Sequence, residues 1–87
     1  MPKLSPVSYK QLVKVFEAEG FRCVRTEGDH MVFTKPGVIR PVVIPKYANV
    51  PVFVIKNNLR TGGISRDRYF ELLGHRVQPA PKLATPL

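Results

Sequence analysis

Residues 21–45 read FRCVRTEGDHMVFTKPGVIRPVVIP, and this stretch decides the fold. Aromatic and β-branched residues, with few strong helix formers, occupy Phe21–Thr26 and His30–Thr34, which predicts two strands. Residues 27–29, Glu-Gly-Asp, have the composition of a turn, so the two strands should form a β-hairpin. A second turn at residues 35–37, Lys-Pro-Gly, leads into a third predicted strand over Val38–Ile44.

The order of the strands follows from Pro41. Proline has no N–H to donate to a ladder, so the third strand should lie at an edge of the sheet. A meander in sequence order satisfies this and leaves the 30–34 strand in the middle. Period-two alternation then sends Met31 and Phe33 to the core and His30 to the opposite face.

A register for the second and third strands also follows from the turn. If the turn pairs Thr34 with Val38, the register continues until His30 lies opposite Val42. Arg40 would then be diagonal to His30 on the same face. This arrangement depends on the register, and an error of one residue would remove it.

The flanking segments have the signatures of helices. Ser8 and Gln11 form a predicted capping box at the start of a helix that Gly20 ends. Pro51 suits the first residue of a second helix, which should end at residues 62–63, Gly-Gly. Ser65 should cap a short last helix that ends near Leu73. The element order predicts an α+β fold, with helices on one face of a three-stranded antiparallel sheet.

The length and composition indicate one domain over residues 1–74, followed by a Pro-rich flexible tail over residues 75–87. Fourteen Lys and Arg residues against six Asp and Glu residues give a formal net charge of +8 and an isoelectric point near 10.2. That excess favours a nucleic-acid partner, bound less tightly as salt rises.

Other classes of function are disfavoured by what the sequence lacks. No apolar run approaches the roughly 20 residues that cross a bilayer, and no signal peptide is evident, so a cytoplasmic location is expected. Cys23 is the only cysteine, which excludes an intrachain disulfide and a multi-cysteine zinc site, and we expect it to be buried. Asp67 and Glu71 fit the last helix, so no carboxylate pair suggests two-metal chemistry. No cofactor is expected.

A histidine on a basic open sheet face suits RNA cleavage. Imidazole can take a proton from a ribose hydroxyl or give one to a leaving oxygen, while arginine holds the phosphate. Taken alone, however, a histidine at the start of a strand is more often an ordinary surface residue. The candidate catalytic residue is His30, and the likeliest phosphate and base contacts are Arg40, Lys46 and Tyr47. Further candidate backbone contacts are Lys35, Arg22, Arg25 and Arg60.

An ordered set of short motifs runs from Leu4 to Leu73. The motifs are Glu19-Gly20-Phe21, Val24-Arg25, Gly28-Asp29-His30, Val43-Ile44-Pro45, Ile55 through Leu59-Arg60, and Gly63-Ile64-Ser65. In this order and spacing the chain resembles the HicA (YcfA-like) family of toxins. It departs from that family's pattern at Asp29, where members commonly have serine, and at residues 46–47, Lys-Tyr, near which members often have a histidine.

The resemblance implies a fold and a function. The fold would be αβββα, like a double-stranded-RNA-binding domain. The function would be that of the toxin in a type II toxin–antitoxin system, an mRNA interferase that cleaves messenger RNA without a metal. The catalytic histidine would be His30, and a HicB-type antitoxin would neutralise the toxin by covering it.

Two alternatives remain open on the sequence. One is a non-catalytic RNA-binding module of the same fold, and the other is an interaction protein whose basic face docks an acidic partner. The sequence also leaves open the RNA sequence preference, the oligomeric state, and whether water or the 2′-hydroxyl attacks. His75, near the predicted end of the last helix, is not expected to be catalytic. Asp29 has two possible effects, because its charge could repel a phosphate or it could orient His30.

Overall fold

The computed structural model describes residues 3–74. Its elements are α1 (Tyr9–Ala18), β1 (Arg22–Glu27), β2 (His30–Thr34), β3 (Val42–Pro45), α2 (Val52–Gly62) and α3 (Arg66–Leu73). The tail predicted over residues 75–87, together with His75, lies outside the described residues.

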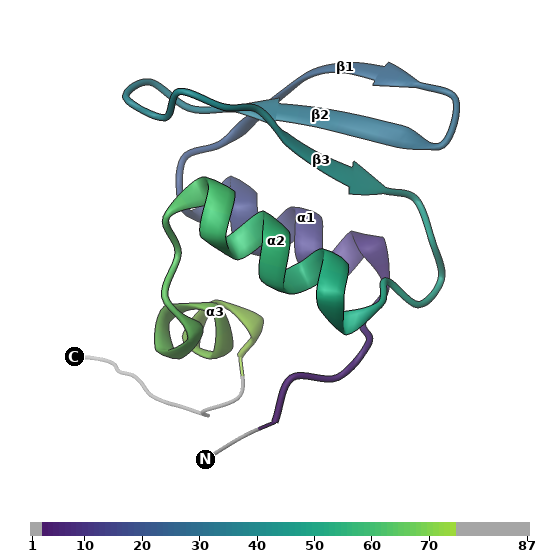
Figure 1. The fold of residues 1–87 in the computed structure, drawn as a ribbon, viewed down its shortest axis with the longest axis vertical. Coiled ribbons are helices and arrows are strands. Elements are labelled where there is room, and N and C mark those ends of the chain that lie inside the picture. The colour runs from purple at the N-terminus through teal and green to yellow at the C-terminus, as the bar shows by residue number, and fades with distance from the viewer. Residues whose placement is uncertain (1–2, 75–87) are drawn as a thin grey trace, which may run out of the picture.

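The strands form one antiparallel sheet in the order β1-β2-β3. β2 is therefore central and β3 is an edge strand, as predicted. Figure 1 shows α1 and α2 against one face of this sheet, with α3 beyond them, while the opposite face is uncovered. The fold is α+β and resembles a double-stranded-RNA-binding domain, which confirms the predicted class.

The predicted register between β2 and β3 is wrong. His30 lies opposite Pro45 rather than Val42, a shift of three residues, and β3 begins only at Val42. The Val38 N–H does close a tight turn onto the Lys35 carbonyl at 3.0 Å, but pairing with β2 resumes only at Val42, after Pro41, which has no N–H with which to start a ladder. Arg40 consequently precedes the sheet and is not diagonal to His30.

The core lies between the sheet and the helices. Phe33 is fully buried and Met31 is partly buried against the same cluster, which confirms the predicted alternation along β2. The fully buried side chains come from the sheet, from all three helices and from the segment before α2, and they are Leu12, Val15, Phe16, Phe33, Val42, Ile44, Val50, Ile55 and Tyr69. Val32 is also buried but belongs to the other face of the sheet, outside this cluster.

The helices begin where their caps predict. The Ser8 N–H donates to Gln11 Oε1 at 3.3 Å and the Gln11 N–H donates to Ser8 Oγ at 3.4 Å, which is a capping box. Pro51 is the N-cap of α2, one residue before the helix rather than its first residue. α2 is capped at its C-terminal end by Gly63, whose φ of 71° is the left-handed conformation that glycine adopts without strain.

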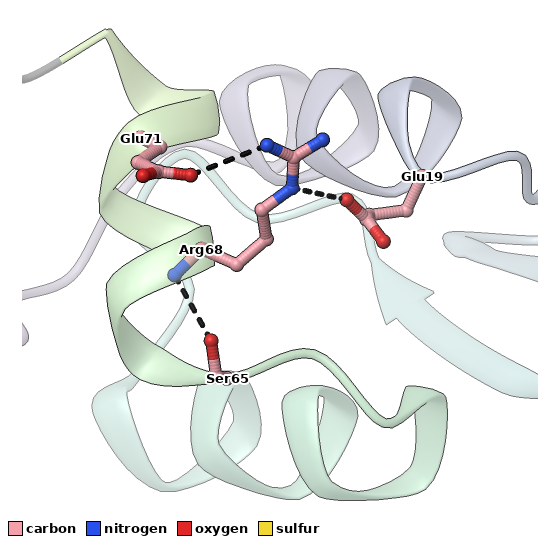
Figure 2. Close-up of polar contacts among 4 residues, drawn as sticks. All are labelled: Glu19, Ser65, Arg68 and Glu71. Atoms are coloured by element: carbon pink, nitrogen blue, oxygen red, sulfur yellow. Dashed lines mark hydrogen bonds and ion pairs between the residues drawn. The ribbon is translucent and has the colours of Figure 1, made fainter.

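Arg68 fastens α3 to the end of α1. Its Nε donates to Glu19 Oε2 at 2.5 Å and its Nη1 donates to Glu71 Oε1 at 3.2 Å, while the Ser65 hydroxyl accepts from its backbone N–H at 3.1 Å (Figure 2). The pKa of Arg68 is raised, chiefly by the hydrogen bond to Glu19. The guanidinium thus joins two helices that are 49 residues apart at these positions.

Tyr69 carries a buried hydroxyl that has no hydrogen-bond partner among residues 3–74. Because burial disfavours the phenolate, it raises the pKa of Tyr69 from 10.0 to about 12. The unfolded chain therefore releases this proton from about pH 10, whereas the folded chain keeps it until about pH 12. The contribution of Tyr69 ionisation to folding stability is therefore complete below about pH 10 and is lost as the pH rises through about 12.

Tyr69→Phe should leave stability at neutral pH within about 1 kcal/mol of the parent or raise it, since it removes an unpaired buried hydroxyl. It should also weaken the loss of stability between pH 10 and 12. Urea unfolding at neutral and alkaline pH measures both effects, with Tyr47→Phe, a change at an exposed tyrosine, as the control. A large destabilisation at neutral pH would show that the Tyr69 hydroxyl has a partner in solution.

Gly62 ends α2 in close contact with two aromatic rings. A Cβ at this position would lie 2.9 Å from Phe16 Cε2 and 3.1 Å from Phe21 Cζ. Both rings are buried and pack edge to face, with centroids 5.2 Å apart. The rings therefore have little room to move.

Gly62→Ala should destabilise the fold by about 1–3 kcal/mol, because overpacking outweighs the gain of up to about 1 kcal/mol in helix propensity. Urea unfolding checks the sign. Thr61→Ala, a change at the neighbouring position of the same helix end, is the control and should change stability little. Equal or higher stability for Gly62→Ala would mean that the two rings can shift.

Candidate functional site

Strand pairing sets out the uncovered face of the sheet in rows. Partners directly opposite each other point to the same face, so the outward residues of β2 can be matched to those of β1 and β3. The rows are Glu27, His30 and Pro45; then Arg25, Val32 and Val43; then Arg22 and Thr34. The face therefore has an apolar centre, with His30 at one end and Arg22 at the other.

His30 is exposed at the start of β2, as predicted, with 48% of its side chain accessible. Its Nδ1 lies 2.8 Å from Asp29 Oδ1. A carboxylate can only accept, so Nδ1 carries the hydrogen and, in the neutral ring, Nε2 bears the lone pair. Nε2 has no hydrogen-bond partner among the described residues. The ring is thus held by one nitrogen and presents the other for chemistry.

The β1–β2 turn is tied to the end of β3. The Lys46 N–H donates to the Asp29 carbonyl at 2.6 Å, immediately after Pro45 pairs with His30. The next residue, Tyr47, is 41% exposed, and its carbonyl accepts from the Tyr9 N–H at 3.0 Å. The structure therefore brings Lys46 and Tyr47, both predicted site residues, to the His30 end of the sheet.

Arg25 is also near this end, but its charge is already paired. Its Nε lies 2.6 Å from Glu27 Oε2, and Glu27 is the β1 residue opposite His30. Asp29 places a second carboxylate beside the imidazole. The two carboxylates offset the positive charges of Arg25 and Lys46, so the surroundings of His30 are close to neutral despite the chain's net charge.

The other predicted contacts lie at the opposite end of the sheet. Arg40 and Arg60 line an open groove of about 700 Å³ between the β2–β3 connection and the end of α2. Arg22 and Lys35 line a second hollow of about 460 Å³, and Lys35 Nζ lies 5.5 Å from the centroid of the Phe21 ring. This end is four residue steps along β2 from His30, about 13 Å.

Cys23 corrects another prediction, since it is exposed rather than buried. β1 is an edge strand whose residues are all exposed, because α1 and α2 pack against β3 and leave β1 uncovered. A β-bulge between Cys23 and Arg25 also interrupts the ladder there. The Cys23 thiol approaches the Arg25 carbonyl with Sγ at 3.4 Å.

Two kinds of feature are absent from residues 3–74. No three His, Cys, Asp or Glu side chains in this range gather as a group that could hold a metal ion. None of the helices in the same range combines the length and the apolar character that crossing a membrane requires.

A comparison with protein families decides what kind of chain this is. The family model described as the HicA toxin of bacterial toxin–antitoxin matches residues 9–64, well over half of the sequence. The chain belongs to the HicA toxin family. The HicA match runs from the first residue of α1 to the second residue after α2, so it includes His30 and the whole sheet. No curated protein matches the chain in a sequence comparison.

Family membership confirms the resemblance found in the sequence and makes this HicA domain a toxin of the toxin–antitoxin kind. A toxin of that kind has an antitoxin as its partner. The match ends before α3, so the Arg68 contacts that fasten α3 to α1 lie outside the region common to the HicA model.

The contact with Asp29 predicts the tautomer of His30. The neutral ring should carry its hydrogen on Nδ1, and an NMR experiment that correlates the ring nitrogens with the ring carbon-bound protons reads this directly. Asp29→Ala should shift the population toward the Nε2–H form, because the acceptor for Nδ1 is lost. Asp29→Asn, whose amide oxygen can still accept, should keep the Nδ1–H form. Identical spectra for all three proteins would exclude an orienting role for Asp29.

Proposed function

We propose that this chain is an endoribonuclease that cleaves messenger RNA, with His30 as its catalytic residue. The observation that carries the proposal is the exposed imidazole, held through Nδ1 by Asp29 with Nε2 uncommitted, on the uncovered sheet face of a HicA-family domain. A general base must reach the proton that it removes, and an imidazole at the open end of a strand can do so on an RNA laid across the face.

In the proposed reaction Nε2 of His30 removes a proton from the attacking oxygen, which is either the ribose 2′-hydroxyl or a water molecule. The new P–O bond forms as the P–O bond to the neighbouring ribose breaks. The imidazolium made by the first transfer then returns its proton to the leaving oxygen. Asp29 acts as a positioning residue, since it sets the orientation and the tautomer of the ring.

Charge in the transition state needs stabilisation from nearby cations. Lys46 is exposed at the same end of the sheet, and Arg25 lies one row away. We assign the scissile phosphate to Lys46, because the guanidinium of Arg25 already binds Glu27. Tyr47 is placed to stack on a base beside the cut. Imidazole and ammonium groups supply both the proton transfer and the charge stabilisation, so we propose that cleavage needs no metal.

The uncovered face also fits a protein inhibitor. Val43 is 41% exposed and Val32 lies beside it, so the centre of the face is apolar while its ends are polar. A HicB-type antitoxin that packs on this apolar centre would cover His30 and exclude RNA. We therefore propose one face for both partners, with the antitoxin competing for the RNA site.

One observation favours the second candidate function, a non-catalytic RNA-binding module. Asp29 and Glu27 both lie next to His30, and carboxylates repel a phosphate. In that case His30 would be a surface residue and RNA would bind without being cut. A comparison of the parent with a His30→Ala variant separates the two functions, because only an enzyme loses activity when the imidazole is removed.

His30→Ala should abolish cleavage while leaving RNA binding intact, since the exposed ring contributes to the reaction and little to folding. General acid–base groups contribute about 10²–10⁴-fold, so the rate should fall by that order. The measurement is cleavage of messenger RNA by purified parent and variant in the presence of EDTA, with binding measured in parallel.

Two outcomes would contradict the proposal. Unchanged cleavage by the His30→Ala protein would remove His30 from the reaction. Activity that disappears with EDTA and returns with magnesium would contradict the metal-free mechanism. Thr26→Ala, at an exposed position of β1 that pairs with Met31 and lines neither hollow, is the control for non-specific damage to the sheet and should retain activity.

A further inference from the structure

The β2–β3 connection is flanked by two hollows that are lined by basic residues. Arg40 and Arg60 line one, and Arg22 and Lys35 line the other, on either side of the turn at residues 35–37. Neither lining includes an acidic residue. We call these four residues the far-end basic site, because they lie at the end of the sheet away from His30.

The two arginines of the larger groove have their donors free for a ligand. Within residues 3–74 neither the Arg40 nor the Arg60 side chain makes a hydrogen bond or an ion pair, whereas the side chains of Arg25 and Arg68 both bind carboxylates. Arg60 lies in the last turn of α2, where it also offsets the negative end of the helix dipole. A guanidinium has five N–H donors, so this role leaves it able to bind a phosphate in a bidentate manner.

The distribution of charge distinguishes the two ends of the sheet. At the His30 end, Glu27 and Asp29 offset the nearby cations. At the other end, four cations surround one turn with no carboxylate in either lining. Electrostatic affinity for a polyanion comes from uncompensated charge, so of the two ends of the sheet the far end should contribute more of it.

We propose that the far-end basic site binds the phosphates of the same RNA strand several nucleotides away from the bond that His30 cuts. Four cations spread over two hollows match the regular charge of a nucleic-acid backbone better than a single carboxylate. The larger groove also carries Gly37 and Gly63, where a Cβ would meet nothing within 4 Å, so the absence of side chains there lets a strand approach the backbone closely. The choice of RNA as the ligand rests on the function proposed above.

In this proposal, RNA affinity and catalysis come from different ends of the sheet. The far-end basic site would hold the RNA, while the nearly neutral surroundings of His30 would carry out the proton transfers. An RNA must then be long enough to cover the length of β2 from His30 to Thr34, about 13 Å, and to continue beyond it before it gains the full binding energy. A dinucleotide at the His30 end would bind weakly and would not sense the far end.

The test is a binding experiment that does not depend on catalysis. Parent protein and an Arg40→Gln/Arg60→Gln variant are titrated with a labelled 2′-O-methyl oligoribonucleotide over a range of salt concentrations in EDTA. The blocked 2′-oxygens cannot attack, and gel analysis after each titration shows that water has not cut the strand either. The variant should bind at least about tenfold more weakly. The slope of the logarithm of its affinity against the logarithm of the salt concentration should become shallower by about 1.4, because each of the two lost phosphate contacts contributes roughly 0.7 to that slope. Binding of a dinucleotide should be the same for both proteins.

A charge-matched variant is the control. Lys10→Gln/Lys14→Gln removes the same number of positive charges from exposed positions on α1 that line neither hollow. Its affinity should change much less than that of the arginine variant. Circular dichroism and urea unfolding of both variants show whether each is folded, and Arg40→Lys/Arg60→Lys should restore part of the affinity if a variant with glutamine is unstable.

The outcomes separate this proposal from the catalytic one. Equal loss in both variants would mean that only net charge matters and would overturn the site. Unchanged RNA binding with lost binding of polyglutamate would assign the groove to an acidic protein segment and would also overturn it. Lost RNA binding in the arginine variant supports the far-end basic site even if His30→Ala still cleaves RNA. Unchanged RNA binding in the arginine variant would contradict the far-end basic site and would leave the proposed role of His30 unaffected.

Discussion

The pleat of β2 places the candidate site. Phe33 is fully buried against the helices, and alternate residues of a strand point to opposite faces, so His30 cannot turn inward without pulling Phe33 into water. Burying a phenylalanine side chain stabilises a fold by about 1.5–3 kcal/mol. The packing of the core therefore holds the imidazole on the uncovered face, and the chemistry depends on a constraint set on the other side of the sheet.

Short contacts then fix what surrounds the imidazole. The Asp29 side chain binds Nδ1 of His30, and the Asp29 carbonyl accepts from the Lys46 N–H. One residue thus joins the β1–β2 turn, the ring and the end of β3. The same aspartate, together with Glu27, makes this end of the sheet nearly neutral. Positive charge without a nearby carboxylate therefore lies at the β2–β3 end of the sheet.

The errors of sequence reasoning have physical causes in particular residues. Arg40 was placed beside His30 because a tight turn was assumed at residues 35–37, whereas pairing resumes only at Val42, after Pro41. Turn length is decided by where a ladder can restart, and local composition does not fix it. Cys23 was expected in the core because cysteine is often buried, yet the helices pack under β3 and leave β1 exposed.

The sequence by itself determined the elements, their order in the sheet, the caps at Ser8 and Ser65, and the face on which His30 lies. These follow from local rules: period-two alternation, capping chemistry and the missing N–H of proline. Only the tertiary structure decided the register of β3, the contact between Asp29 and His30, and the separation of Arg40 and Arg60 from the imidazole. Those depend on which segments meet across the sheet, and many different turns are compatible with the same local pattern.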